Sequence, residues 1–119
     1  MKKLLFLVVI VCLYFASYAQ YSSPESVVFD ATNNRYLISN AGSGNIVQRS
    51  CTGNTTTFIS GLTSPKGMVI VGTRLFVTDV TSVRGFNLSN GSSVMNLAIT
   101  GSSFLNDIEN PGRFLIKMH

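Results

Sequence analysis

Histidine, tryptophan and charged side chains are scarce in this chain. Of 119 residues one is His, none is Trp, and 12% are charged, with 9 Lys or Arg against 5 Asp or Glu. A single His, at position 119, argues against a Ser-His-Asp triad and against a multi-His metal site. The net charge of +4 comes without a basic run, so the sequence does not predict nucleic-acid binding.

The longest apolar run lies at the N-terminus. A positive start at 2–3 precedes unbroken apolar residues over 4–13, and Ser17 and Ala19 supply small residues three and one before a cleavage point. This three-part layout predicts a secretory signal peptide over 1–19, with Gln20 as the first mature residue. We therefore expect a secreted or periplasmic protein.

Two other interpretations of this segment are weaker. A transmembrane anchor over 4–19 would be shorter than the roughly 20 residues that span a bilayer, so we expect no stable membrane anchor. A lipoprotein signal at Cys12 is disfavoured because Val11 is too large for the usual small residue.

Cleavage of the signal peptide leaves Cys51, which has no internal disulfide partner. We interpret it as a small side chain near a turn, with a reactive or intermolecular thiol as the alternative.

The rest of the chain has the composition of a β protein. Ser, Thr, Asn and Gly supply 44 of residues 20–119, whereas Ala supplies only 3. Short apolar runs recur, each bounded by turn-forming residues, and no window keeps apolar residues at helical spacing. The composition therefore predicts an all-β fold.

A repeat with a period near 40 organises this β region. Residues 35–40, 74–79 and 113–118 align at a spacing of 39, and each begins with Arg. We interpret these Arg residues as charged residues that open a strand, with a basic ring for acidic ligands as the alternative. A second set, 24–27, 65–68 and 105–108, aligns in the same units. A period of this length is typical of a repeat architecture.

Each unit divides into short strands, as a blade of a β-propeller does. We expect three blade units, at approximately 24–63, 64–103 and 104–119, within a partial propeller domain over 20–119. The fold class is thus all-β, with two blades of four antiparallel strands and one hairpin after a signal-peptide helix. The expected strands are 27–30, 36–39, 46–49, 55–60, 68–71, 75–78, 83–87, 94–99, 107–109 and 114–117.

Two and a half blades do not close a ring, which needs about 4–8. We expect the chain to be a piece of a larger propeller, with assembly of several copies as the alternative. In either case the open blade edges predict self-association.

Three phrases carry a family resemblance: 65–68 (PKGM), 74–79 (RLFVTD) and 83–88 (VRGFNL). They resemble the SMP-30/gluconolactonase/LRE-like family and are similar to NHL-repeat propellers. The resemblance covers roughly residues 24–110 and implies a six-bladed propeller. It identifies the architecture better than the activity, because propellers of different function share these phrases.

The SMP-30/gluconolactonase resemblance also implies a site. Enzymes of that family hydrolyse lactones with one divalent cation, held in the central channel by Glu, Asn and Asp side chains. Asn106 matches the Asn of the family's Asn-Asp phrase and would be a metal ligand, with Asp107 as a substrate or shell residue. Glu25 would be the other ligand for Ca²⁺, Mg²⁺ or Zn²⁺, but Pro24-Glu25-Ser26 departs from the family's Glu-Gly-Pro order.

The repeat register points to the same region. Glu25, Lys66 and Asn106 occupy equivalent positions at the start of the first strand of each unit. In a propeller that strand lines the channel, so we expect these side chains, with Asp107, at a common rim. Glu25 and Asn106 offer the oxygen ligands that a divalent cation prefers, whereas Lys66 favours an anionic or sugar-like small-molecule ligand. Surface polar residues without a ligand are the plainest alternative.

The function that follows from the sequence is a secreted ligand- or partner-binding or scaffold module. The alternative is a piece of a metal-dependent lactone hydrolase that is inactive alone. No residue is assigned a catalytic role, and whether the chain is an enzyme stays open.

Overall fold

The computed structural model describes residues 21–110, 112 and 115–118, and these residues form ten strands. The signal peptide predicted over 1–19 lies outside the described residues, as do Arg113 and His119. All ten expected strands are present. They are β1 (Pro24–Asp30), β2 (Arg35–Asn40), β3 (Asn45–Ser50), β4 (Thr55–Ile59), β5 (Pro65–Val71), β6 (Arg74–Asp79), β7 (Ser82–Asn87), β8 (Ser93–Ala98), β9 (Leu105–Glu109) and β10 (Leu115–Met118).

The strands form three antiparallel sheets in which neighbours in sequence are neighbours in space. The first sheet has the order β1-β2-β3-β4, the second has β5-β6-β7-β8, and the third pairs β9 with β10. Tight turns join the strands, and Gly91 shows why turn formers are frequent: it adopts a φ of 73°, which is easy only for glycine. Among the described residues no helix is long and apolar enough to cross a membrane.

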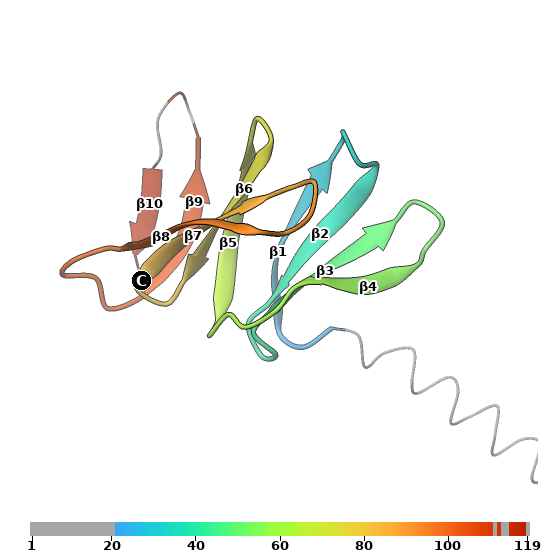
Figure 1. Cartoon of the computed structure of the whole chain (residues 1–119). Helices are drawn as coiled ribbons and strands as arrows, with labels where there is room; N and C mark the ends of the chain where they lie inside the picture. Colours follow the sequence, from blue (N-terminus) through green and yellow to red (C-terminus); the bar gives the residue numbers. More distant parts are fainter. Residues whose placement is uncertain (1–20, 111, 113–114, 119) are drawn as a thin grey trace, which may run out of the picture.

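The three sheets pack face to face, with their first strands side by side. β1 lies next to β5 and β5 lies next to β9, while the later strands of each sheet spread outward (Figure 1). One apolar cluster fills the space between the first and second sheets, and a second fills the space between the second and third. The first cluster holds Leu37, Ile46, Ile59, Leu62, Met68, Leu75, Val77, Phe86 and Leu88; the second holds Phe76, Val83, Leu105 and Ile108.

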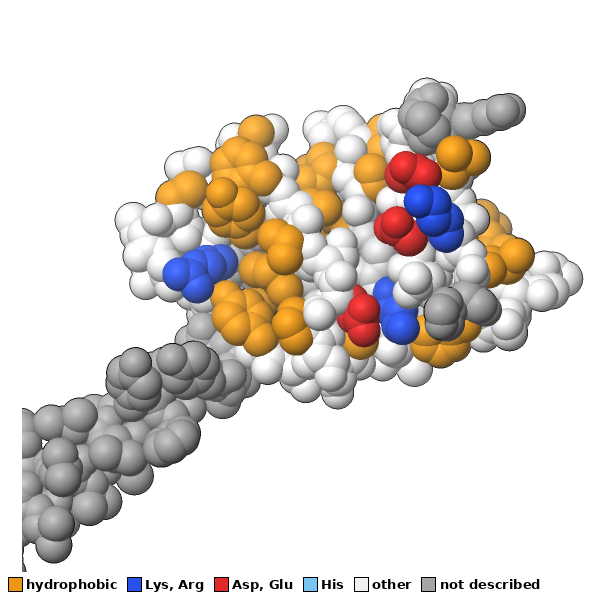
Figure 2. All heavy atoms as spheres, turned by 180° about the vertical axis from the view of Figure 1, so that it is seen from behind, with side chains coloured by type: hydrophobic (Ala, Val, Ile, Leu, Met, Phe, Trp, Pro, Cys, Tyr) orange, Lys and Arg blue, Asp and Glu red, His pale blue; other side chains and the backbone are white. Residues whose placement is uncertain are grey.

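Not all apolar side chains are buried. Val27, Phe29 and Tyr36 of the first sheet stay exposed. Figure 2 shows a hydrophobic patch on the side of the molecule that carries this sheet. The first sheet therefore buries one face against the second sheet and leaves the other open.

In the first two sheets, a buried polar residue at the end of the second strand fixes the chain that enters the sheet. Asp79 ends β6, and its carboxylate accepts hydrogen bonds of 2.7–3.1 Å from the backbone N–H groups of Thr63 and Ser64. Asn40, 39 residues earlier, accepts one from the N–H of Ser22 at 3.3 Å. The Asp that closes the phrase RLFVTD therefore has a structural role, because it satisfies backbone donors in the loop before β5.

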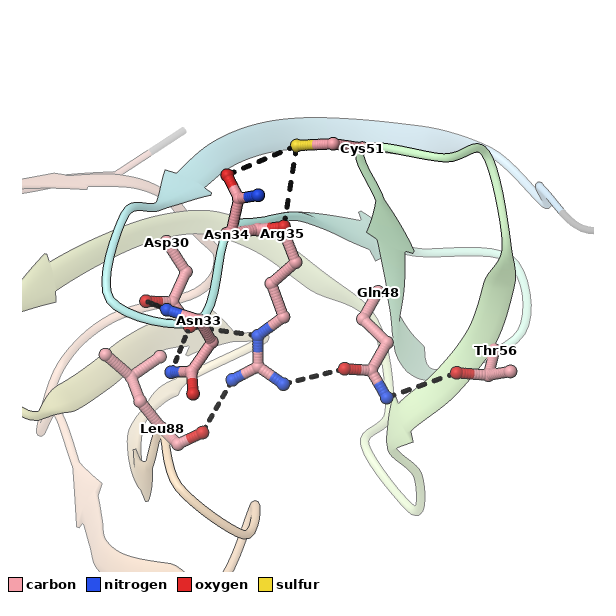
Figure 3. A network of polar contacts seen from close by, with 8 residues as sticks. All are labelled: Asp30, Asn33, Asn34, Arg35, Gln48, Cys51, Thr56 and Leu88. Carbon is pink, nitrogen blue, oxygen red and sulfur yellow. Dashed lines mark hydrogen bonds and ion pairs between the residues drawn. The ribbon is translucent and has the colours of Figure 1, made fainter.

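A charged network around Arg35 ties the first sheet to the second (Figure 3). Its Nε lies 2.9 Å from Oδ2 of Asp30, and both side chains are buried. Its other nitrogens donate to Oε1 of Gln48 at 2.7 Å and to the carbonyl of Leu88 at 2.5 Å, and the guanidinium lies 4.1 Å from the Phe58 ring centroid. Arg35 therefore has a structural role.

The equivalent Arg in the next unit has a different environment. Arg74 is exposed, and its register partner is Val71, at the position that Asp30 holds in the first sheet.

Cys51 is also exposed, and its thiol lies 3.3 Å from Oδ1 of Asn34.

Candidate functional site

The first strand of each sheet carries an irregularity close to its start. In β1 the pairing shifts between Pro24 and Ser26, which leaves Glu25 without a partner in the ladder. In β5 the shift between Pro65 and Met68 frees 66–67, and in β9 the partners of Lys117 and Met118 leave Asn106 unpaired. β-bulges of this kind change the direction of a side chain. The three positions that the repeat aligns are thus positions where the pairing of the first strands is interrupted.

These interruptions border one polar pocket of about 430 Å³. Glu25, Ser26 and Val27 of β1 line it, with Gly67 of β5 and with Asn106 and Asp107 of β9. Glu25 and Asn106 are exposed, and Asp107 is half-buried. Residues from all three sheets, far apart in the sequence, therefore meet at one place.

Gly67 sets the distance between the strands that form the pocket. A Cβ at this position would lie 2.6 Å from the Cα of Asp107 and 2.9 Å from the backbone nitrogen of Ile108. The N–H of Gly67 donates to Oγ1 of Thr78 at 2.9 Å instead of to the ladder. β9 can approach β5 this closely only because position 67 has no side chain.

Two further contacts hold the pocket walls in place. Ser39 of β2 donates its hydroxyl to the carbonyl of Lys66 at 2.6 Å, which joins the first sheet to β5. Oδ1 of Asp107 accepts the N–H of Ile108 at 2.8 Å, which leaves Oδ2 turned to other partners.

The charges at the pocket are mostly acidic. Glu25 and Asp107 are both on its wall, whereas the ammonium of Lys66 lies over the ring of Phe104, 4.6 Å from its centroid. Lys117 lies 3.4 Å from a carboxylate oxygen of Glu109 and 4.0 Å from Oδ2 of Asp107, and all three side chains are at least half exposed. Solvent screens such pairs, so the wall keeps carboxylates that are free to accept hydrogen bonds.

The described residues do not complete a metal centre. No group of three or more His, Cys, Asp and Glu side chains in this part of the chain could hold a metal ion. Glu25, Asn106 and Asp107 offer hard oxygen donors, but Ca²⁺ takes 6–8 oxygen ligands and Lys117 competes for Asp107. The pocket fits hydrogen-bonding groups better than it fits a cation.

Three of the four residues selected from the sequence therefore share the pocket wall: Glu25, Asn106 and Asp107. Lys66 is next to Gly67 of that wall, but its ammonium is directed to Phe104. Sequence reasoning missed Ser26 and Val27, which carry no chemical signal of their own. Gly67 was visible as the glycine of the phrase PKGM, although its role in strand contact was not.

Neither the models of known protein families nor the sequences of curated proteins give a significant match to this chain.

Proposed function

We propose that the three sheets are consecutive blades of a β-propeller and that the chain acts as a binding module. Two four-stranded antiparallel sheets and one hairpin follow a repeat of about 40 residues, and their first strands lie side by side. Propeller blades have these properties around a central channel. The phrases that resemble SMP-30/gluconolactonase and NHL-repeat propellers support the same architecture.

One observation carries the functional proposal: the bulged positions of two separate blades, Glu25 and Asn106, open onto a single polar pocket together with Asp107. Carboxylates accept hydrogen bonds from hydroxyl groups, and an amide both donates and accepts. The volume of about 430 Å³ is within the range of small-molecule sites. The ligand is accordingly a hydroxyl-rich, sugar-like molecule that is neutral or positively charged, since two carboxylates repel an anion.

Calorimetric titration of the purified chain with glucose, glucosamine and gluconate tests this proposal. These three probes share a carbon skeleton and differ in charge. We expect binding of the neutral and the cationic probe and at least roughly tenfold weaker binding of the anionic one. Absence of binding for all three, or preference for gluconate, would refute the assignment.

Variants locate the binding. Asn106→Ala and Glu25→Gln should each weaken binding by roughly fivefold or more, the effect of losing one or two hydrogen bonds. Asn96→Ala is the matched control, because Asn96 is also exposed but lies on β8, away from the pocket wall. If Asn106→Ala and Asn96→Ala changed the affinity equally, the ligand would not bind in this pocket.

The second candidate function is that of a piece of a divalent-metal-dependent lactone hydrolase, inactive alone. The observation that favours it is that the oxygen donors of Glu25, Asn106 and Asp107 face one pocket. It requires further donors, because the described residues do not complete the set. Titration with CaCl₂, MgCl₂ and ZnCl₂, followed by a gluconolactone hydrolysis assay, tests it; the same affinity for cations in the Glu25→Gln and Asn106→Ala variants would count against it.

The leader predicted over 1–19 would deliver the module outside the cytoplasm. N-terminal sequencing of the exported protein should then begin at Gln20. A product that retains Met1 would contradict this part of the proposal.

A further inference from the structure

The open face of the first sheet combines apolar side chains with a single cation. Val27, Phe29 and Tyr36 are 60%, 48% and 44% exposed. Val27 and Tyr36 line a shallow groove of about 320 Å³, together with Tyr21, Pro24, Ile38 and Arg49. Figure 2 shows this patch as a continuous hydrophobic area.

The repeat shows that the equivalent face of the second sheet is covered. In register, Val27, Phe29, Tyr36, Ile38 and Arg49 correspond to Met68, Ile70, Leu75, Val77 and Phe86 of the second sheet. Those counterparts pack in the cluster between the first and second sheets. The open face thus has the character of an interface between sheets.

The other open face, on the third sheet, has a different character. Asp107, Glu109 and Lys117 stand there at the positions of Gly67, Val69 and Thr78 in the second sheet. The two carboxylates lie within 4.0 Å of the Lys117 ammonium. Leu115, the register partner of Glu109, is 45% exposed beside these charges, so the described part of this face is mixed in character, whereas the open face of the first sheet is mainly apolar.

We propose that the open face of the first sheet binds the same face of a second copy of this chain, in a closed two-fold dimer. Arg49 of β3 and Tyr36 of β2 are register partners. A two-fold axis parallel to the strands and between β2 and β3 brings Arg49 of each copy over the Tyr36 ring of the other. A guanidinium over an aromatic ring is favourable, and the chain already uses this contact between Arg35 and Phe58.

The area sets the strength of this dimer. Four strands about 4.8 Å apart and about six residues long form a face of roughly 20 by 20 Å. Its projected area, about 400 Å² per copy, is smaller than the roughly 800 Å² that each partner buries in a standard interface. The dimer is therefore weak, with a dissociation constant in the micromolar range. This inference does not depend on a ligand in the polar pocket.

Sedimentation equilibrium of the purified chain tests the dimer, over about two decades of micromolar concentration. A reductant keeps the Cys51 thiol from forming an intermolecular disulfide. We expect a reversible monomer–dimer equilibrium. A monomer at all concentrations would overturn the proposal, and species that grow beyond the dimer would replace the two-fold contact with head-to-tail assembly.

Phe29→Lys places a charge next to Tyr36, whose ring centroid lies 5.0 Å from that of Phe29, and should weaken the dimer by roughly tenfold or more. Leu97→Lys on β8 and Leu115→Lys on the third sheet are matched controls, because these leucines are 52% and 45% exposed elsewhere. Either control dissociating the dimer as strongly as Phe29→Lys would overturn the assignment of the face.

Arg49→Gln keeps the inference testable if Phe29→Lys fails to fold. Arg49 is exposed, so its replacement should leave the circular dichroism spectrum unchanged. The loss of the contact with Tyr36 should weaken the dimer roughly threefold to fivefold. An unchanged dimer in this variant would refute the proposed two-fold geometry.

Discussion

Replacing Arg35 by Met isolates the energetic role of the charged network between the first two sheets. The variant keeps most of the length and apolar stem of the side chain but removes the guanidinium. Asp30, which is 1% exposed, then keeps only the hydrogen bonds from Asn33. The carbonyl of Leu88 loses its donor from the neighbouring sheet.

The expected cost follows from the charge that is left behind. Breaking a buried ion pair by removing one partner costs about 3–5 kcal/mol, because the other charge stays buried without compensation. Arg35→Met should therefore lower the free energy of unfolding by about 3–4 kcal/mol. Replacing both partners removes the buried charge. The double variant Asp30→Val/Arg35→Met should therefore be only about 1–2 kcal/mol less stable than the parent chain, and this remaining cost comes from the unpaired Leu88 carbonyl.

The repeat supplies the control. Arg74→Met changes the same residue type at the equivalent position, but Arg74 is exposed and its partner is already Val71, so the cost should stay within about 0.5 kcal/mol. Urea denaturation followed by far-UV circular dichroism measures all three variants. With a slope of about 1.5 kcal/mol/M, Arg35→Met should shift the midpoint by about 2 M. Equal losses for Arg35→Met and Arg74→Met, or a double variant as unstable as Arg35→Met, would refute the reasoning.

Three further predictions concern single contacts. Gly67→Ala should force β5 and β9 apart, lower the free energy of unfolding by about 1–3 kcal/mol and weaken ligand binding, because its Cβ meets the backbone of Asp107; calorimetry checks both effects. Asp79→Ala should cost about 2 kcal/mol by leaving two backbone N–H groups without an acceptor, and Asp79→Asn should cost less, since Asn40 performs this role in the first sheet. The hydrogen bond from Arg49 lowers the pKa of Tyr21 from 10.0, so Arg49→Gln should raise it again in an absorbance titration, with Tyr21→Phe identifying the signal. Because the pKa is lowered in the folded chain, this contact stabilises the fold only at alkaline pH and loses that effect as the pH falls through the folded pKa; stability at neutral pH should not change.

Most of the secondary structure was predictable because local signals agree with the tertiary arrangement. The segments that begin at Arg35 and Arg74 are short apolar runs with polar residues at both ends, and glycine or asparagine marks the turns. Most observed strand boundaries differ from the predicted ones by one to three residues. For example, β5 begins at Pro65, whereas the sequence predicted a start at 68. The bulge explains that difference, because 65–67 extend the strand without regular pairing.

The candidate site was predictable in part. The repeat register placed Glu25 and Asn106 together, and both line the pocket with Asp107. It could not predict that Lys66 would turn to Phe104, because that contact depends on where the chain before β9 crosses β5. Nor could it distinguish Arg35 from Arg74, since an aligned Arg is buried or exposed according to the neighbour at Asp30 or Val71.

The sequence by itself determined the β-strands, their turns and the repeat, because periodicity and turn chemistry act within a few residues of one another. The tertiary structure decided which polar side chains meet at the pocket, which Arg is buried and which sheet face stays open. Those outcomes depend on how one sheet packs on the next, and the residues in contact there, such as Gly67 and Asp107, are separated by an entire unit of the chain.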